Sequence, residues 1–430
     1  MRVLVLATTT GYQTRAFGDA AKRLGVELVF ATDRCHLIED PWQDGAVPIR
    51  FYDEEASVAA IVDAARSRPI DGVLVVGDRP AVIAARVAEA LGLPGHPPAA
   101  AAIAVNKHRT RERLRAAGLA VPWFQTHPIT ADPDTIAPSL TFPCVVKPLA
   151  LSGSRGVIRA DDAGAFRAAW GRLRLLLAAP DIRAERNAAH ATVLVEAFIP
   201  GREFAIEGLL HEGALHVLAV FDKPDPLDGP FFEETIYVTP ASLAAEGERA
   251  IVDAVARAAA AIGLTHGSIH AECRVTPPTS MRAAHGSVFV LEVAPRPIGG
   301  LCARALRFTP GARVSLEELL LRHTLGESPD RWQREPAASG VMMIPIPRRG
   351  VFRSVSGLDA ARRVDGVEDV AITAKPDQRL VPLPEGASYL GFIFARAGTP
   401  AIVERTLREA HACLHFAIES DWPVLQSPHG

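Results

Sequence analysis

Residues 289–300 read FVLEVAPRPIGG, an apolar run that carries one carboxylate and is followed by an arginine and two glycines. A second apolar run, SIHAECRV over residues 268–275, carries Glu272 in the same way. Both runs predict strands, and carboxylates among valines and leucines lose solvation and repel each other unless a cation is near. On adjacent antiparallel strands the two are able to bridge divalent cations, and Mg²⁺ prefers such oxygen ligands together with water and phosphates. The two strands therefore predict a metal site at Glu272 and Glu292.

The segment after Glu292 adds a fixed positive charge. Arg296 is expected to face the same cavity, where a planar guanidinium suits an acyl phosphate or a substrate carboxylate better than the point charge of a lysine. Gly299 and Gly300 permit close approach of the backbone to a ligand. We therefore assign Arg296 to catalysis and to substrate binding, and the two glycines to substrate binding.

A lysine and a glycine-rich loop follow an earlier strand, in CVVKPLALSGSRGV over residues 144–157. Lys147 ends the strand, and the small residues of the loop let backbone N–H groups fold over phosphate oxygens. Taken alone, a lysine before such a loop is more often part of a surface turn. The candidate phosphate contacts are Lys147, Ser152, Gly153, Ser154 and Gly156, with Arg155 as a further catalytic candidate.

The stretch VLVEAFIPGREFAIEG, residues 193–208, predicts two strands joined by a Pro-Gly turn. A strand edge that passes an adenine offers the peptide groups of residues 197–199, while Glu196 accepts from the exocyclic amine. Glu203 is able to hold both ribose hydroxyls, although a solvated hairpin position is the default explanation for a single glutamate. The candidate nucleoside contacts are Glu196, Ala197, Phe198, Ile199 and Glu203.

The chain of 430 residues is long enough for several domains. Residues 1–100 alternate short apolar strands with Ala-rich helical stretches, which predicts a parallel α/β unit. The break LGLPGHPPAAAA, residues 91–102, marks its end. β-rich segments dominate from FPCVVKP onward, with one long helix expected over residues 243–262 that buries Ile251, Val252, Val255 and Ile262. A smaller terminal unit ends in an amphipathic helix around residues 401–414.

Composition limits the possible partners. A net charge of −3 without a dense Lys/Arg block disfavours nucleic acid and anionic membrane surfaces, and no transmembrane span is evident. The five scattered cysteines lack CxxC spacing, so we expect reduced thiols and a cytoplasmic location. TTTGYQT, residues 8–14, lacks the GxGxxG pattern, which disfavours a nicotinamide site.

The order of these motifs resembles the ATP-grasp superfamily, and within it the carboxylate-amine ligases that include the L-amino acid ligases. The resemblance covers VNKHRTRERLRAAGLAVP with Lys107, the Lys147 strand and loop, EAFIPGREF and FVLEVAPR. The terminal stretch GASYLGFIFARAGTPAIVERTLREAHACL is similar to the small closing domain of L-amino acid ligases. It implies an α/β, more narrowly α+β, ATP-grasp fold with a pre-ATP-grasp domain (1–100), a central subdomain (101–195), a C-terminal grasp subdomain (196–335) and a small C-terminal domain (336–430).

The resemblance also implies roles. Lys107 and Lys147 would contact nucleotide phosphates, Glu196 and the backbone after it adenine, and Glu203 ribose. Glu272 and Glu292 would bind Mg²⁺, with Mn²⁺ as an alternative. The implied reaction is ATP-dependent: a carboxylate becomes an acyl phosphate, an amine captures it, and ADP and phosphate are released. The substrates would be small molecules, amino acids above all, and the assembly a homodimer.

One position departs from the family pattern Glu-x-Asn-x-Arg, because Ala294 stands where an asparagine often helps to ligate the second Mg²⁺. Water is able to replace a neutral ligand of Mg²⁺, so we expect weaker metal affinity rather than lost activity. Glu234 is a candidate for the substrate ammonium and Arg304 for a second carboxylate. Tyr237 occupies the place of the histidine in the Glu-x-x-His pattern of similar ligases.

Three alternatives remain open at this level. A biotin-carboxylase-like enzyme would share the fold, although the chain lacks an AMKM-type biotinylation tetrapeptide. A ligase of nucleotide biosynthesis would use the same acyl-phosphate chemistry on a phosphorylated substrate. A regulatory module would bind ATP without turnover.

Overall fold

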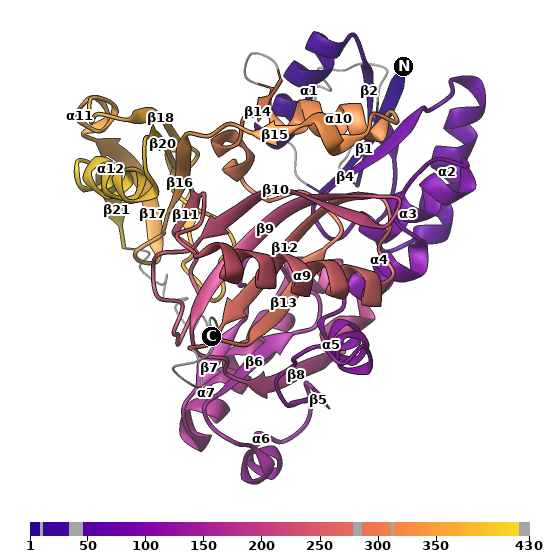
Figure 1. The fold of residues 1–430 in the computed structure, drawn as a ribbon. Coiled ribbons are helices and arrows are strands. Elements are labelled where there is room, and N and C mark those ends of the chain that lie inside the picture. Colours follow the sequence, from indigo (N-terminus) through magenta and orange to yellow (C-terminus); the bar gives the residue numbers. More distant parts are fainter. Residues whose placement is uncertain (9–11, 34–45, 278–285, 311–313, 421–430) are drawn as a thin grey trace, which may run out of the picture.

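The computed structural model describes residues 1–8, 12–33, 46–277, 286–310 and 314–420. Helices and sheets are both abundant, which confirms the predicted α/β class (Figure 1). In the described part of the chain no helix has the length and the apolar character needed to cross a membrane.

The N-terminal unit is a parallel sheet flanked by helices, as the alternating segments predict. It consists of β1 (Arg2–Ala7), α1 (Tyr12–Leu24), β2 (Glu27–Thr32), β3 (Ala46–Pro48), α2 (Glu54–Ser67), β4 (Gly72–Val76) and α3 (Ala81–Ala90). The strand order is β3-β2-β1-β4. Thr8 and Asp78, just beyond the carboxyl ends of β1 and β4, line a large cavity, which is where open parallel sheets bind ligands.

The central unit is a small antiparallel sheet with a long helix on it. It contains α4 (Pro98–Ala104), α5 (Lys107–Ala116), β5 (Phe124–Pro128), α6 (Pro133–Ile136), β6 (Cys144–Pro148), β7 (Ile158–Ala160), α7 (Ala163–Leu177), α8 (Pro180–Ala184) and β8 (Thr192–Ala197). The strand order is β5-β8-β6-β7. Phe166, Trp170 and Leu173 recur at helical spacing on α7 and are buried against the sheet.

The remaining chain is built around one eight-stranded sheet. Its strands are, in spatial order, β13 (Val288–Ala294), β12 (Gly267–Val275), β9 (Arg202–His211), β10 (Ala214–Asp222), β11 (Ile236–Thr239), β16 (Ala338–Ile344), β20 (Gly391–Ala397) and β18 (Val367–Ile372). Because β11 pairs with β16, the boundary expected between residues 335 and 336 falls inside a single sheet.

Helices and short strands complete this part. They are α9 (Ala245–Ile262), β14 (Phe308–Thr309), α10 (Leu316–Thr324), β15 (Gln333–Arg334), β17 (Gly350–Ser356), α11 (Leu358–Arg362), β19 (Arg379–Leu380), α12 (Pro400–Ala412) and β21 (His415–Glu419). Helix α9 starts two residues later than predicted and ends before Gly263, whose φ of 93° allows a left-handed cap. It buries Ile251 and Val255 as expected, whereas Val252 is only half-buried.

Candidate active site

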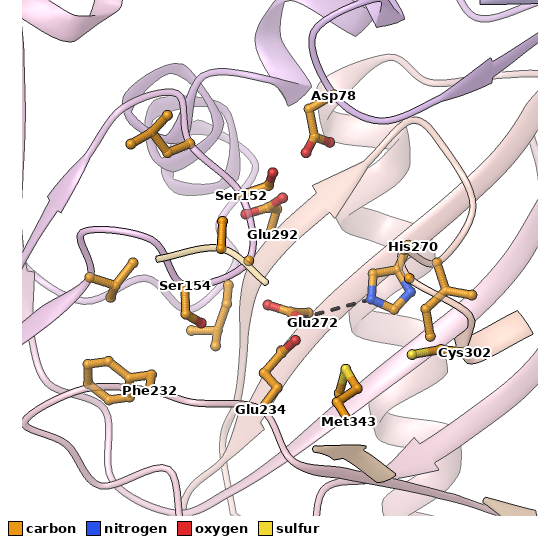
Figure 2. Close-up of a pocket in the computed structure, with 18 of the residues that line it drawn as sticks. Asp78, Ser152, Ser154, Phe232, Glu234, His270, Glu272, Glu292, Cys302 and Met343 are labelled. Carbon is orange, nitrogen blue, oxygen red and sulfur yellow. Dashed lines mark ion pairs between the residues drawn. The ribbon is translucent and has the colours of Figure 1, made fainter. Parts of the chain in front are cut away.

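A cavity of about 550 Å³ lies where the three units meet, a size typical of cofactor and substrate sites. It gathers most residues that the sequence singles out, from β6, β8, β12, β13 and the glycine-rich loop. The predicted residues that line it are Lys107, Lys147, Ser152, Gly153, Ser154, Glu196, Ala197, Phe198, Ile199, Glu203, Glu234, Glu272, Glu292, Arg296, Gly299 and Gly300. In Figure 2 the carboxylates of Glu234 and Glu272 lie close together, and that of Glu292 lies beside Ser152.

On the side of the cavity formed by β6 and β8, two buried cations share one carboxylate. We call Arg111, Lys147 and Glu196 the Glu196 cluster. Arg111 Nε donates to Glu196 Oε2 at 2.8 Å, and Lys147 Nζ donates to Glu196 Oε1. Burial alone would raise the pKa of Glu196, but Arg111 and Lys147 outweigh burial and lower it to about 2. Both oxygens of Glu196 thus accept from cations, and its contact with an adenine amine stays a prediction.

The pKa of Lys147 is also lowered, but for a lysine this favours the neutral form. Burial lowers this pKa to about 8; Glu196 opposes the shift, whereas Arg111 and Lys107 repel the ammonium. The two pKa values are consistent, because two cations stabilise the ionised form of one carboxylate, while neighbouring cations destabilise the charged form of Lys147. Sequence reasoning missed Arg111, although it lies four residues after Lys107 on α5 and therefore on the same helical face.

On the other side of the cavity three carboxylates share Lys223, and we call Lys223, Glu203, Glu234 and Glu272 the Lys223 cluster. Arg274 Nε also donates to Glu203 Oε2, at 2.8 Å. Lys223 Nζ lies 2.8 Å from Glu203 Oε1, 2.5 Å from Glu234 Oε1 and 2.9 Å from Glu272 Oε1. Burial would lower the pKa of Lys223, but the three carboxylates raise it well above its usual value. Sequence reasoning missed Lys223, yet a Lys-Pro pair directly follows β10, just as a Lys-Pro pair ends the strand of Lys147.

Individual carboxylates of the Lys223 cluster differ in their protonation. Burial raises the pKa of Glu234 and outweighs Lys223, and the neighbouring Glu272 adds to the increase. The pKa of Glu272 is lowered, because Lys223 and a hydrogen bond from Glu234 outweigh its burial. This pattern places a shared proton on Glu234 and keeps Glu272 ionised.

Glu272 and Glu292 lie directly opposite each other on the antiparallel strands β12 and β13, as predicted. Their side chains keep 24% and 23% exposure toward the cavity, so both are accessible to a cation. Lys107 Nζ lies 3.5 Å from Glu292 Oε2 and donates to Leu151 O at 2.7 Å, which connects the glycine-rich loop to β13. Ionised carboxylate oxygens in a polar cavity are the donor set that Mg²⁺ prefers. The residues present therefore fit a magnesium ion.

Ala294 is buried and pairs with His270 across the same two strands. His270 Nδ1 bonds Glu207 Oε2 at 3.0 Å, and its Nε2 lies 4.0 Å from Glu272 Oε1 (Figure 2). Glu207 in turn accepts from the backbone N–H of Ile298 at 3.1 Å. The imidazole thus lies beside the methyl group that replaces the family's asparagine, and its orientation is fixed by a buried carboxylate.

Arg296 is held by a residue of the N-terminal unit. Its Nε and Nη2 donate to Asp78 Oδ1 and Oδ2 at 2.8 and 3.2 Å, a paired geometry that fixes the guanidinium plane. Burial would raise the pKa of Asp78, but Arg296 outweighs burial and lowers it. One sequence signal points to Asp78, namely its place just after an apolar strand of a parallel unit.

Three predicted residues do not join the cavity. Arg155 donates to Glu385 O and to Asp181 Oδ2, both at 2.8 Å, so its guanidinium faces the terminal unit. Gly156 donates its N–H to Pro384 O at 2.9 Å, and a side chain there would meet Leu176 at 2.9 Å, so its role is close packing. Arg304 pairs with Asp369 Oδ2 at 2.7 Å over the ring of Phe394.

The end of the cavity beyond the Lys223 cluster is largely apolar. It is lined by Tyr237, Cys302, Met343, Tyr389 and Phe392. Burial raises the pKa of Cys302 far above its usual value, so its thiol is not a nucleophile at neutral pH. Burial likewise raises the pKa of Cys144 to about 12, so this thiol is also unreactive at neutral pH.

Comparisons with known proteins identify the domains that surround this cavity. The chain matches the ATP-grasp domain family over residues 140–305, the ATP-grasp N-terminal domain over 18–95 and the L-amino acid ligase C-terminal domain 2 over 342–419. The crystal structure of an L-amino acid ligase from Bacillus licheniformis superposes with a TM-score of 0.82 at 29% identity, covering 98% of this chain and 99% of that chain.

Two protein sequences are also similar. Carnosine synthase 1 of Gallus gallus is 29% identical over 79% of this chain, which spans only 38% of that longer protein. An uncharacterized protein of Sinorhizobium fredii, y4rH, is 24% identical over 98% of this chain and 83% of its own length. The domain matches, the order of the domains and the residues that line the cavity all point to the same family. The chain is therefore an ATP-grasp enzyme of the carboxylate-amine ligase class with a C-terminal domain of the L-amino acid ligase type.

Proposed function

We propose that this enzyme joins the carboxylate of one amino acid to the amine of a second, with ATP converted to ADP and phosphate. The observation that supports this proposal is the convergence of Glu272, Glu292 and Arg296 with two lysines in one cavity. The substrate carboxylate attacks the γ-phosphate of ATP and forms an acyl phosphate. The amine then attacks the acyl carbon, and phosphate leaves.

In this proposal the chain supplies position and charge rather than a nucleophile. Lys107 and Lys147 bind the phosphates, and the N–H groups of residues 152–154 cover them. Adenine is bound by Glu196, which Arg111 and Lys147 orient, and by the peptide groups of residues 197–199. Glu203 accepts from the ribose hydroxyls.

Glu272 and Glu292 would hold magnesium, which supplies charge neutralisation for the transferring phosphoryl group. Arg296, oriented by Asp78, stabilises the charge that develops on the acyl phosphate. The glycine-rich loop excludes water, which would otherwise hydrolyse this intermediate.

Substrate recognition is proposed at the Lys223 cluster and the apolar wall beside it. Glu234 faces the position of a substrate ammonium, and Tyr237, Met343 and Phe392 form a surface for an apolar side chain. We also propose the division into residues 1–100, 101–195, 196–335 and 336–430, a homodimer on the basis of the resemblance, and a cytoplasmic location that suits the four free cysteines of the described chain.

The decisive experiment is a pairwise screen of amino acids for ADP release, with mass detection of the amide products. We expect a product whose mass is the sum of two amino acids less one water. Nucleotide binding without ADP release from any pair would favour the regulatory module instead. ADP release that depends on bicarbonate and biotin, or on a phosphorylated substrate, would favour one of the other two ligase types.

A further inference from the structure

Three histidines gather at the end of the large sheet that is remote from the active site. His211 is the last residue of β9, His266 precedes β12, and His323 lies in α10. Helix α10 lies between the N-terminal unit and the large sheet (Figure 1). At about 3.3 Å per residue along β9, His211 is roughly 26 Å from Glu203, so the three imidazoles do not belong to the ligase site.

The imidazole nitrogens have the spacing of metal ligands. One nitrogen from each ring lies within 4.8 Å of the other two. His211 Nδ1 is 3.3 Å from His323 Nε2, and two ligands about 2.05 Å from a tetrahedral Zn²⁺ are about 3.3 Å apart. The rings of His266 and His323 stack with centroids 4.5 Å apart.

The local environment favours a cation that accepts nitrogen ligands. Among the described residues, the buried Nε2 of His266 has no hydrogen-bond partner, a costly arrangement that a metal would relieve. A cavity of about 50 Å³ borders His266 and His323, which leaves room for a water ligand.

We propose that His211, His266 and His323 bind one borderline divalent transition-metal ion, such as Zn²⁺ or Co²⁺, with water in the fourth position. Imidazole suits these ions, whereas Mg²⁺ requires oxygen ligands, so the ion is not interchangeable with that of the active site. The ion ties α10 to the β9–β12 pair, and its role is structural.

The test uses the full chain after treatment with a chelator, in excess Mg²⁺ so that the carboxylate site is filled. Co²⁺ is added while visible absorption is recorded, and Zn²⁺ binding is measured by calorimetry. We expect one equivalent of Co²⁺ with the intense ligand-field bands of a four-coordinate ion, and a higher thermal midpoint with Zn²⁺. His211→Gln and His266→Gln should lose this equivalent, whereas His415→Gln, an exposed histidine on β21, and Glu272→Gln should retain it.

X-ray absorption of the zinc-loaded wild-type chain counts the imidazole ligands directly and needs no variant that folds. Three imidazoles are expected. Absence of a bound equivalent in excess Mg²⁺, retention of it by both variants, or fewer than two imidazoles around the zinc would overturn the proposal. The three rings would then form only a hydrogen-bonded and stacked cluster.

Discussion

The Glu196 cluster and the Lys223 cluster are both groups of buried ion pairs, but the charge of the shared central residue is opposite in the two. In the first, two buried cations share one carboxylate, and in the second, three carboxylates share one buried cation. The first leaves excess positive charge where phosphates are proposed to bind. In the second, Glu272 stays ionised and faces the cavity where magnesium and an ammonium are proposed to bind. Each cluster is therefore stable before its ligand arrives, yet remains complementary to that ligand.

The largest expected effect concerns the metal side. Glu292→Gln removes a charge but keeps the shape of the side chain, so we expect a folded protein whose kcat for ADP release falls by about a thousandfold, as for other lost electrostatic groups in closed sites. Circular dichroism and calorimetric ADP binding without metal verify folding. Near-normal turnover would remove Glu292 from the metal site.

Replacement of the shared cation compares the two clusters directly. Lys223→Met leaves Glu234 and Glu272 without their shared cation, while Glu203 keeps Arg274, and loss of one partner of a buried ion pair costs about 3–5 kcal/mol. We expect the thermal midpoint to fall markedly and Mg²⁺ to restore much of it, because the metal supplies the missing positive charge.

The matched variant is Arg111→Met in the Glu196 cluster. Its midpoint should also fall, but Mg²⁺ should not restore it, because Lys147 already occupies the remaining side of Glu196. Equal rescue of both variants by Mg²⁺ would show that the clusters do not differ in the way their charges indicate.

The affinity for ADP should weaken as the pH rises through about 8. The pKa of Lys147 is lowered to about 8 in the free protein, so only about one tenth of the chains carry this charge at pH 9, and the apparent Kd should rise by up to about tenfold. Because this pKa lies below that of an unfolded lysine, the same group makes the fold more stable as the pH rises above 8. Calorimetric titration with ADP from pH 7 to pH 9.5 measures the change in Kd.

Lys147→Arg is the control for that titration, since arginine keeps its charge throughout this range. Its ADP affinity should be nearly independent of pH. A pH dependence equal to that of the wild type would assign the effect to another group.

The smallest effect is expected at Ala294. Ala294→Asn restores the family's amide beside His270, and we expect the Mg²⁺ concentration at half-maximal activity to fall by less than about tenfold, because water already serves as a neutral ligand. A Mg²⁺ titration of ADP release measures this concentration. An unchanged value together with lower stability would indicate that His270 fills the space that the amide needs.

Residues within single motifs were predictable, and partners across the chain were not. The strand patterns placed Glu272 and Glu292 correctly on neighbouring strands, because the carboxylate-bearing runs follow each other in sequence. Arg111, Lys223 and Asp78 were missed, since the need for each depends on a carboxylate or arginine at least 11 residues away, as for Lys223 and Glu234. Arg155 was misjudged for the same reason, because its partner Glu385 comes from the terminal unit.

Strands of the terminal domain and the strands β12 and β13, which carry Glu272 and Glu292, belong to one hydrogen-bonded sheet. This sheet is continuous through β11 and β16. That continuity bears on how such enzymes are recombined. A chimaera cut at residue 336 would exchange Met343, Tyr389 and Phe392, which belong to the apolar end of the cavity. It would also have to re-form the backbone pairing of β11 with β16, in which Tyr237 faces Val341. A graft that carries β11 together with the terminal domain keeps the native pairing of β11 with β16. A transfer of specificity would then require this part of the sheet and not the terminal domain alone.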